Sequence, residues 1–240
     1  EKCRMSAQGR SSENTASSNQ AQTVLFETRA VGNNQLLAIA TLNEEKTLNS
    51  LSLEMVELLY TQLQRWESDE RVVAVFLQSA GEKAFCAGGD VQKLRQSSLD
   101  APGGPCEYAE SFFAKEYRLD YYLHEYGKPT ICWGHGIVMG GGLGLLAGCK
   151  HRVVTEKTRM GMPEITIALF PDVGGSWFLN RAPGRTGLYV ALTAASMNAC
   201  DCLFVDYADH FITNETKETV LEQLAALDWS SDNTVNSKAI

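Results

Sequence analysis

Short apolar runs alternate with helix-length amphipathic stretches along much of this 240-residue sequence. Two runs, 24–28 and 36–40, flank the turn-forming residues 32–34, which predicts a strand, a tight turn and a second strand. After Ser52, apolar residues recur at helical spacing as far as Trp66. Further apolar runs at 72–77, 130–133 and 151–155 predict buried strands, and the stretches 90–95, 106–125 and 143–149 predict helices between them. Such alternation predicts an α/β fold.

Composition narrows the class of protein. Hydrophobic residues make up 44% and charged residues 21%, which excludes a fully disordered, collagen-like or coiled-coil chain. The net charge of −8 argues against a general nucleic-acid binder, because such a protein needs a basic face. No apolar run reaches the length of about 18 residues that a membrane span requires. We therefore expect neither a nucleic-acid nor a membrane partner.

The cysteines and histidines favour neither disulfides nor a metal site. The seven cysteines include no C-x-x-C pair, which is typical of reduced cysteines in a reducing compartment. The four histidines show no i, i+4 spacing and have no cysteine cluster beside them, so no metal site is expected.

The first residues differ in character from the rest. The stretch 6–22 is dominated by Ser, Asn, Gln, Glu and Thr, and it predicts a disordered tail over 1–22. It lacks the apolar segment of a secretory signal. Arg4, Arg10 and several serines leave a cleaved organelle-targeting peptide as an alternative.

Two glycine-rich segments each follow a predicted strand and precede a predicted helix. In 84–91, Gly88 and Gly89 allow backbone N–H groups to point outward at a helix start, which favours a developing negative charge. The alternative is an ordinary strand–helix turn with Asp90 as the helix N-cap. The second segment, 134–144, exposes backbone donors in the same way before its helix.

The second segment also contains a dinucleotide-binding pattern. Residues 142–147 fit G-x-G-x-x-A, and Glu164 lies about 20 residues further on. That fingerprint requires the acidic residue to end a second strand, whereas Glu164 follows Pro163. A nicotinamide cofactor is therefore disfavoured.

A third segment, 162–175, carries two carboxylates among apolar residues. Glu164 directly follows Pro163 and Asp172 directly follows Pro171, and each proline fixes the local backbone. Desolvation raises the pKa of such a carboxyl group and suits it to acid–base chemistry. Asp172 has a simple alternative role as the N-cap of a helix that begins near Val173. Glu164 has less structural purpose, because no cation lies near it in the sequence.

Together these segments resemble the crotonase (enoyl-CoA hydratase/isomerase) superfamily. The matching motifs occur in the family's order and spacing: Asn43-x-x-Lys46-x-Leu48-Asn49-x-Leu51, Phe85-Cys86-Ala87-Gly88-Gly89-Asp90, His135-Gly136-x-x-x-Gly140-Gly141-Gly142, and Pro163-Glu164 followed by Pro171-x-x-Gly174-Gly175. The resemblance implies a crotonase-like spiral of ββα units over 23–185. It also implies a helical C-terminal region over 186–240, cut short relative to the family. Finally, it implies an acyl-CoA substrate with no separate cofactor, and it is compatible with a homotrimer or homohexamer.

The resemblance also implies roles for individual residues. The amides of Gly89 and Gly141 would form an oxyanion hole for the thioester oxygen, and we expect them to converge on one point. Glu164 and Asp172 would act on the bound thioester. Substrate contacts would come from Lys46, near the CoA phosphates, and from three further residues: Ala87, Asp90 and Glu116.

One departure from the family bears on the reaction. Hydratases carry a glutamate in G-G-G-x-E, where this sequence has Gly144. Adding water across a double bond needs both a base and an acid, so the loss disfavours ordinary hydration. The segments around Glu164, Asp172 and Glu116 resemble instead the 3-hydroxyisobutyryl-CoA hydrolases of valine breakdown, although Glu116 could equally be a solvated charge on a helix.

The resemblance therefore predicts an acyl-CoA thioester hydrolase in a bacterial cytoplasm or a mitochondrial matrix. Whether Glu164 acts as base or nucleophile stays open. Two alternatives also remain: a hydratase or isomerase that uses Glu164 alone, and a non-catalytic module that binds CoA.

Overall fold

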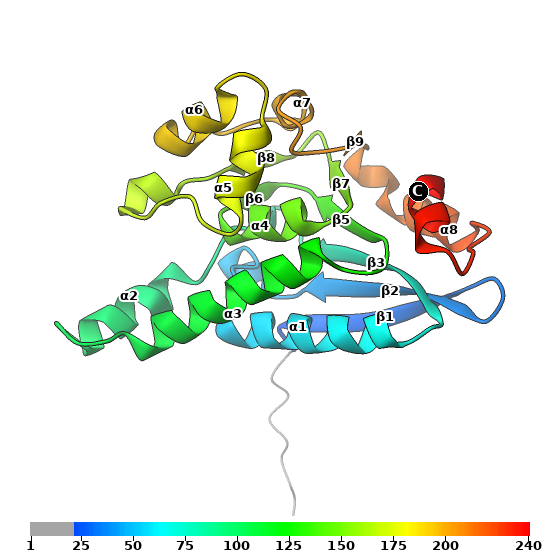
Figure 1. Cartoon of the computed structure of the whole chain (residues 1–240), viewed down its shortest axis with the longest axis horizontal. Coiled ribbons are helices and arrows are strands. Elements are labelled where there is room, and N and C mark those ends of the chain that lie inside the picture. Colours follow the sequence, from blue (N-terminus) through cyan, green and yellow to red (C-terminus); the bar gives the residue numbers. More distant parts are fainter. Residues whose placement is uncertain (1–21) are drawn as a thin grey trace, which may run out of the picture.

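The structure, a computed structural model, describes residues 22–240, so most of the tail expected over 1–22 lies outside the described residues. Two sheets and their covering helices form one α/β unit (Figure 1). The strands are β1 (Val24–Val31), β2 (Gln35–Leu42), β3 (Val72–Ser79), β4 (Ala84–Cys86), β5 (Thr130–Gly134), β6 (Ile137–Met139), β7 (His151–Val154), β8 (Arg159–Gly161) and β9 (His210–Phe211).

The helices confirm the α/β prediction. The α-helices are α1 (Leu53–Ser68), α2 (Val91–Asp100), α3 (Glu107–His124), α4 (Gly141–Gly148), α5 (Gly175–Phe178), α6 (Thr186–Thr193), α7 (Ala199–Phe204), α8 (Lys217–Ala225) and α9 (Asn233–Ala239). Short 3-10 helices are η1 (Glu45–Thr47), η2 (Glu164–Ile167), η3 (Leu179–Arg181) and η4 (Asn214–Thr216). The expected start of α1 is confirmed, because the Ser52 side chain accepts a hydrogen bond from Met55 N.

The larger sheet has six strands in the order β1-β2-β3-β5-β7-β9. The hairpin β1–β2 is antiparallel and the remaining pairs are parallel. Successive side chains alternate between two apolar layers. One layer packs beneath α1, α3 and α4 and includes Ala40, Val75 and Cys132. The other includes Ile39 and Phe76, and it lies beneath α8.

A smaller parallel sheet, β4-β6-β8, lies alongside the larger one. Each of its strands follows a strand of the larger sheet: β3 then β4, β5 then β6, and β7 then β8. Helical segments follow each pair before the chain returns. This is the spiral of ββα units that the sequence predicts, and the glycine-rich turns lie where β4 and β6 end.

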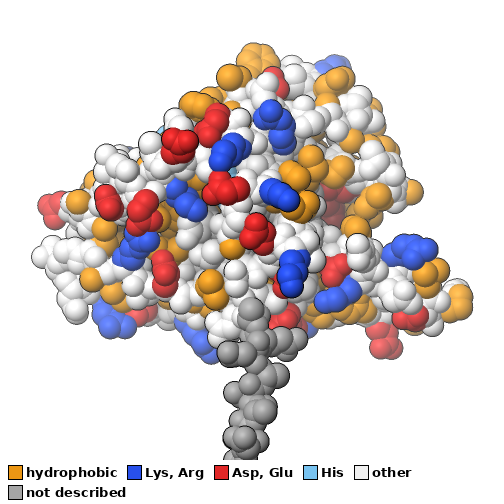
Figure 2. Space-filling model, turned by 180° about the vertical axis from the view of Figure 1, so that it is seen from behind, with side chains coloured by type: hydrophobic (Ala, Val, Ile, Leu, Met, Phe, Trp, Pro, Cys, Tyr) orange, Lys and Arg blue, Asp and Glu red, His pale blue; other side chains and the backbone are white. Residues whose placement is uncertain are grey.

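The molecular surface carries both signs of charge. On the face in Figure 2, basic and acidic side chains of the described residues are interspersed, without a continuous basic area. Within residues 22–240, no helix combines the length and the apolar character needed to cross a bilayer. The cysteines in this range are free thiols: Cys86, Cys106, Cys132, Cys149, Cys200 and Cys202.

Candidate active site

The two glycine-rich turns lie against each other. A Cβ atom built on Gly88, whose φ is +102°, would be 3.3 Å from Met139 O and 3.8 Å from Gly141 N. A Cβ on Gly142 would collide with Cys86 O. Glycine is therefore required on both sides, because the absence of side chains lets the two backbones approach.

Both turns present free amide donors. Neither Gly89 N nor Gly141 N donates a hydrogen bond to a backbone oxygen within residues 22–240. Gly141 is the first residue of α4, where an amide has no partner inside the helix. Two unpartnered N–H groups on adjacent turns suit an oxygen that gains negative charge. That these two amides converge on one oxygen stays a prediction.

The loop before α1 holds the first turn in place. Leu51 N donates to Gly88 O at 2.8 Å, and Asp90 N donates to Leu51 O at 2.9 Å. Buried Asn49, at φ 55°, donates from Nδ2 to the carbonyls of Ala80 and Ala84, each at 3.0 Å. Asn49 and Leu51 belong to the first motif of the sequence, and their contacts are structural.

Glu164 begins η2 and approaches the second turn. Glu164 is only 5% exposed, and its Oε1 would be 2.7 Å from a Cβ built on Gly140. Its Oε2 is buried without a hydrogen-bond partner among the described residues. Burial, followed by the charge of Asp172, raises the pKa of Glu164 to about 7. A carboxyl group with this pKa can exchange a proton near neutral pH.

Glu116 reaches both turns from α3. It is 2% exposed, so the alternative of a solvated helix charge is wrong. Its Oε1 would be 3.8 Å from a Cβ on Gly89 and would collide with a Cβ on Gly141. Burial and three neighbouring carboxylates raise its pKa well above the usual value.

Asp172 is held by a tyrosine and does not cap a helix. Tyr117 Oη donates to its Oδ2 at 2.6 Å. The N-cap of α5 is Gly174, so the expected capping role of Asp172 is wrong. The reason is that the chain makes a left-handed turn before α5 begins, with a φ of 43° at Val173. Burial raises the pKa of Asp172, and the hydrogen bond from Tyr117 opposes that rise.

Val173 is a strained position beside the site. A β-branched residue rarely adopts a positive φ, and such strain persists only where the surroundings enforce it. A Cβ built on Gly144 would be 2.6 Å from Val173 Cβ. Gly144 thus leaves room for Val173, which in turn orients Asp172. A glutamate at position 144 would displace this contact, so the structure offers no ready space for the hydratase residue.

The other expected substrate contacts lie on the first loop and the first turn. Lys46 is exposed on η1. Ala87 N donates to Leu48 O at 3.1 Å. Asp90 caps α2, where its side chain accepts from Lys93 N at 3.2 Å, as the simpler interpretation of the first turn predicts.

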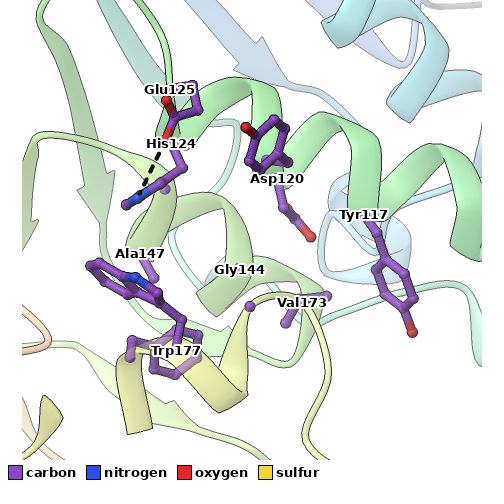
Figure 3. A pocket seen from close by; sticks show the side chains of 12 residues that line it. Tyr117, Asp120, His124, Glu125, Gly144, Ala147, Val173 and Trp177 are labelled. Carbon is purple, nitrogen blue, oxygen red and sulfur yellow. Dashed lines mark ion pairs between the residues drawn. The ribbon is translucent and has the colours of Figure 1, made fainter. Parts of the chain in front are cut away.

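Two further residues lie at this site, Tyr117 and Asp120, and the sequence motifs assign a role to neither. Asp120 follows Glu116 by four residues on α3, so both project from one helix face. That spacing of two acidic residues on an otherwise apolar face was the available signal. Figure 3 shows Asp120 reaching from α3 toward Val173 and Gly144. Within residues 22–240, no cluster of His, Cys, Asp and Glu could hold a metal ion.

Comparison with known proteins places this geometry in a family. The family described as "Enoyl-CoA hydratase/isomerase" matches residues 37–239. The chain belongs to the enoyl-CoA hydratase/isomerase family. It is 41% identical over 197 residues to 3-hydroxyisobutyryl-CoA hydrolase, mitochondrial, from Xenopus tropicalis, covering 82% of this chain and 50% of that protein. The human protein of the same name is 39% identical over 199 residues, covering 83% of this chain and 50% of that one.

Solved structures agree with this assignment. An enoyl-CoA hydratase from Rhodobacter sphaeroides has a TM-score of 0.78 and 33% identity, covering 87% of this chain and 61% of its own. A carnitinyl-CoA dehydratase from Mycobacterium thermoresistibile has a TM-score of 0.77 and 37% identity, covering 89% of this chain and 59% of its own. The crotonase fold that the sequence predicts is confirmed. The chain spans about half the length of the curated relatives it matches.

Proposed function

We propose that this chain hydrolyses an acyl-CoA thioester, with Glu164 as the group that acts on water or on the carbonyl carbon. The observation that carries the proposal is the buried Glu164 carboxyl, which lies beside the second glycine turn with one oxygen unpartnered and a pKa near 7. The two free amides of the adjacent turns supply the matching electrostatic partner for a thioester oxygen.

The proposed chemistry begins with polarisation of the thioester carbonyl by Gly89 N and Gly141 N. In the general-base route, Glu164 takes a proton from water as the water oxygen bonds to the carbonyl carbon. The carbon–sulfur bond then breaks, and the proton on Glu164 passes to the departing sulfur. The products are a carboxylic acid and the CoA thiol. In the nucleophilic route the Glu164 carboxylate itself bonds to the carbon, and the carbon–sulfur bond breaks to release the CoA thiolate. Water then cleaves the anhydride to the carboxylic acid and the Glu164 carboxylate, and the proton released in this step converts the thiolate to the thiol.

Asp172 is proposed to orient the attacking water or to hold the proton of Glu164. Its link to Tyr117 fixes the carboxyl group, and its charge raises the pKa of Glu164. Glu116 is proposed to contact the substrate between the two turns. Lys46 and Ala87 are proposed to contact the CoA portion, because both belong to the loops beside the first turn.

The substrate is proposed to be 3-hydroxyisobutyryl-CoA. The support is that relatives about 40% identical to the chain are named 3-hydroxyisobutyryl-CoA hydrolase. Those relatives are also named as mitochondrial, so we propose the same compartment for this protein. Gly144 and its contact with Val173 favour hydrolysis over hydration, because a hydratase glutamate has no space there without movement of Val173. CoA is part of the substrate, and no separate cofactor is proposed.

A product assay tests the reaction class. The protein is incubated separately with 3-hydroxyisobutyryl-CoA, crotonyl-CoA and a 3-enoyl-CoA, while thiol release and the absorbance of the conjugated double bond are recorded. We expect thiol release from the hydroxyacyl thioester and little change in absorbance with the other two. Fast loss or gain of the double bond without thiol release would favour a hydratase or isomerase. Binding without either change would contradict an enzymatic role.

A further inference from the structure

Asp120 is a buried acid that the proposed hydrolysis does not use. It is 7% exposed, and neither Oδ1 nor Oδ2 has a hydrogen-bond partner among the described residues. A carboxyl group in this state loses its hydrogen bonds to water and gains none from the protein. A buried carboxyl group without a partner is rare, and a bound ligand could supply the missing hydrogen bond.

A cavity of about 300 Å³ adjoins Asp120, on the side where its carboxyl points toward Gly144 (Figure 3). Its walls are mainly aromatic and small residues, which suits a short apolar acyl group. The principal walls are Tyr117, Tyr121, Gly144, Val173, Trp177 and Phe178. Apart from the tyrosines, the titratable residues of the lining are Asp120, His124 and Glu125, and of these only Asp120 is buried.

The position of Asp120 fits a group attached close to a thioester carbonyl. Its Oδ1 would be 3.2 Å from a Cβ built on Gly144. Gly144 lies three residues beyond Gly141 on α4, a rise of about 4.5 Å along the helix. Asp120 therefore lies against the first turn of α4, the same turn whose first amide is proposed to hold the acyl oxygen.

The surroundings of Asp120 favour its neutral, protonated form over the charged form. Burial raises its pKa well above the usual value, and the charge of Asp172 adds to the rise. Glu116 lies one turn earlier on α3, and no cation within residues 22–240 lowers the pKa of either carboxyl group. A neutral carboxyl group has one O–H donor and one carbonyl acceptor. An alcohol hydroxyl matches this pair, because it also both donates and accepts.

We propose that Asp120 binds the hydroxyl group of a hydroxyacyl thioester and makes this cavity selective for hydroxyacyl over unsubstituted acyl groups. The proposal rests on the proposed thioester function and names the feature of the substrate that the site recognises. The cavity should bind an acyl thioester without the hydroxyl more weakly, because the buried carboxyl group of Asp120 would then remain without a hydrogen-bond partner. Asp120 is in this account a specificity-determining residue.

Binding without turnover provides the test. In the Glu164→Gln protein, dissociation constants are measured by calorimetry for 3-hydroxyisobutyryl-CoA and for isobutyryl-CoA, which differ only in the hydroxyl. We expect about tenfold or stronger preference for the hydroxyacyl ligand. Adding Asp120→Ala should bring the ratio close to one. Adding Asp120→Asn should retain much of the preference, because the amide still offers a donor and an acceptor.

Isobutyryl-CoA serves as the internal control, since its affinity should change little in either double variant if the fold is intact. Equal affinity for both ligands in the Glu164→Gln protein would overturn the proposal, whatever the Asp120 variants do. An unchanged preference in the Asp120→Ala protein would also overturn it. A preference that depends on Asp120, together with no thiol release by the unmodified protein, would support hydroxyl recognition and contradict the proposed hydrolysis alone.

Discussion

Four carboxyl groups meet at the glycine turns: Glu116, Asp120, Glu164 and Asp172. Burial is the largest cause of a raised pKa in each of them, and the charge of a neighbouring carboxylate adds to the rise for Glu116, Asp120 and Glu164. Four adjacent negative charges would be costly in this interior, so the cluster favours binding of protons. Glu164, with a pKa of about 7, is the member best suited to release its proton near neutral pH.

The first prediction concerns the pH dependence of thiol release. Because the carboxylate form of Glu164 is the reactive one, turnover should rise as pH increases through about 7 and then level off. Initial rates at thioester concentrations well below KM, which report kcat/KM and thus the free enzyme, are measured from pH 5.5 to 8.5. Rates that stay constant over this interval would contradict Glu164 as the titrating group.

The second prediction concerns the stability of the fold and Asp120. Burial holds the pKa of Asp120 in the folded protein well above its ordinary value in an unfolded chain, so the folded protein binds more protons than the unfolded chain between these two values. Stability associated with this group is therefore lost as pH rises above the lower value. Asp120→Asn removes that loss, so it should raise the melting temperature at pH 7.

The gain from Asp120→Asn should shrink as pH falls to about 4 and below, because the aspartic acid then becomes protonated in the unfolded chain as well as in the folded protein. Thermal unfolding at several pH values gives the comparison. The matched control is Asp232→Asn at the exposed helix cap of α9, which should change stability little at either pH, because asparagine caps a helix about as well as aspartate does. A gain from Asp120→Asn that is the same at pH 4 and pH 7 would disprove the linkage.

At the scale of elements, close packing between α4 and its neighbours determines the site geometry. Gly142 lets α4 touch the end of β4, and Gly144 lets it touch the loop that carries Val173 and Asp172. A helix with small residues at these places can bring its first amide next to the turn at Gly89. The glycines of α4 therefore act through packing as well as through their free amides.

The third prediction tests this packing. Gly144→Ala should destabilise the protein by about 1–3 kcal/mol and slow turnover, because its methyl group would press on Val173 and displace Asp172. Adding Val173→Gly removes the opposing side chain and should recover part of both losses. Gly32→Ala is the matched control, since a Cβ there meets no atom within 4 Å. Additive effects of the two substitutions would contradict the proposed contact.

Much of the element pattern could be predicted from the sequence. The hairpin β1–β2, the helices α1 and α3 and the strands β3 and β5 follow from apolar periodicity and turn residues. The loop before α5 could not be predicted in this way. Capping preferences favour Asp172 as a helix N-cap, and they do not anticipate the left-handed backbone of Val173. The contact of Asp120 with Gly144 also depends on packing between α3 and α4, which a linear pattern does not encode.

At the scale of the whole molecule, the spiral brings together segments that lie far apart in the sequence. The strands of the smaller sheet carry the two turns to one place, where Glu116 of α3 and Glu164 of η2 supply carboxyl groups. Figure 1 shows α3 next to α4, which begins at the second turn. The opposite face of the larger sheet is closed by α8 and by Trp229, whose Nε1 donates to Leu224 O at 2.8 Å. The C-terminal segment is thus part of the core.

The fourth prediction concerns that closure. Trp229→Ala should lower the free energy of unfolding by about 3–5 kcal/mol, because the side chain is buried at 4% exposure and would leave a cavity. Trp177→Ala is the matched control, since Trp177 is 44% exposed and its loss should cost far less. Denaturant unfolding followed by circular dichroism compares them. Equal losses for both variants would contradict the proposed contribution of α8 and Trp229 to the core.

The most direct test of the account is the effect of Glu164→Gln on thiol release. The amide has nearly the same shape but cannot take a proton from water or attack a thioester efficiently. The account predicts that turnover of 3-hydroxyisobutyryl-CoA falls by about a hundredfold or more, whereas the dissociation constant for the thioester changes little. Glu110→Gln, on the exposed start of α3, is the matched control and should leave turnover unchanged. Near-native turnover by Glu164→Gln would contradict the assignment of Glu164.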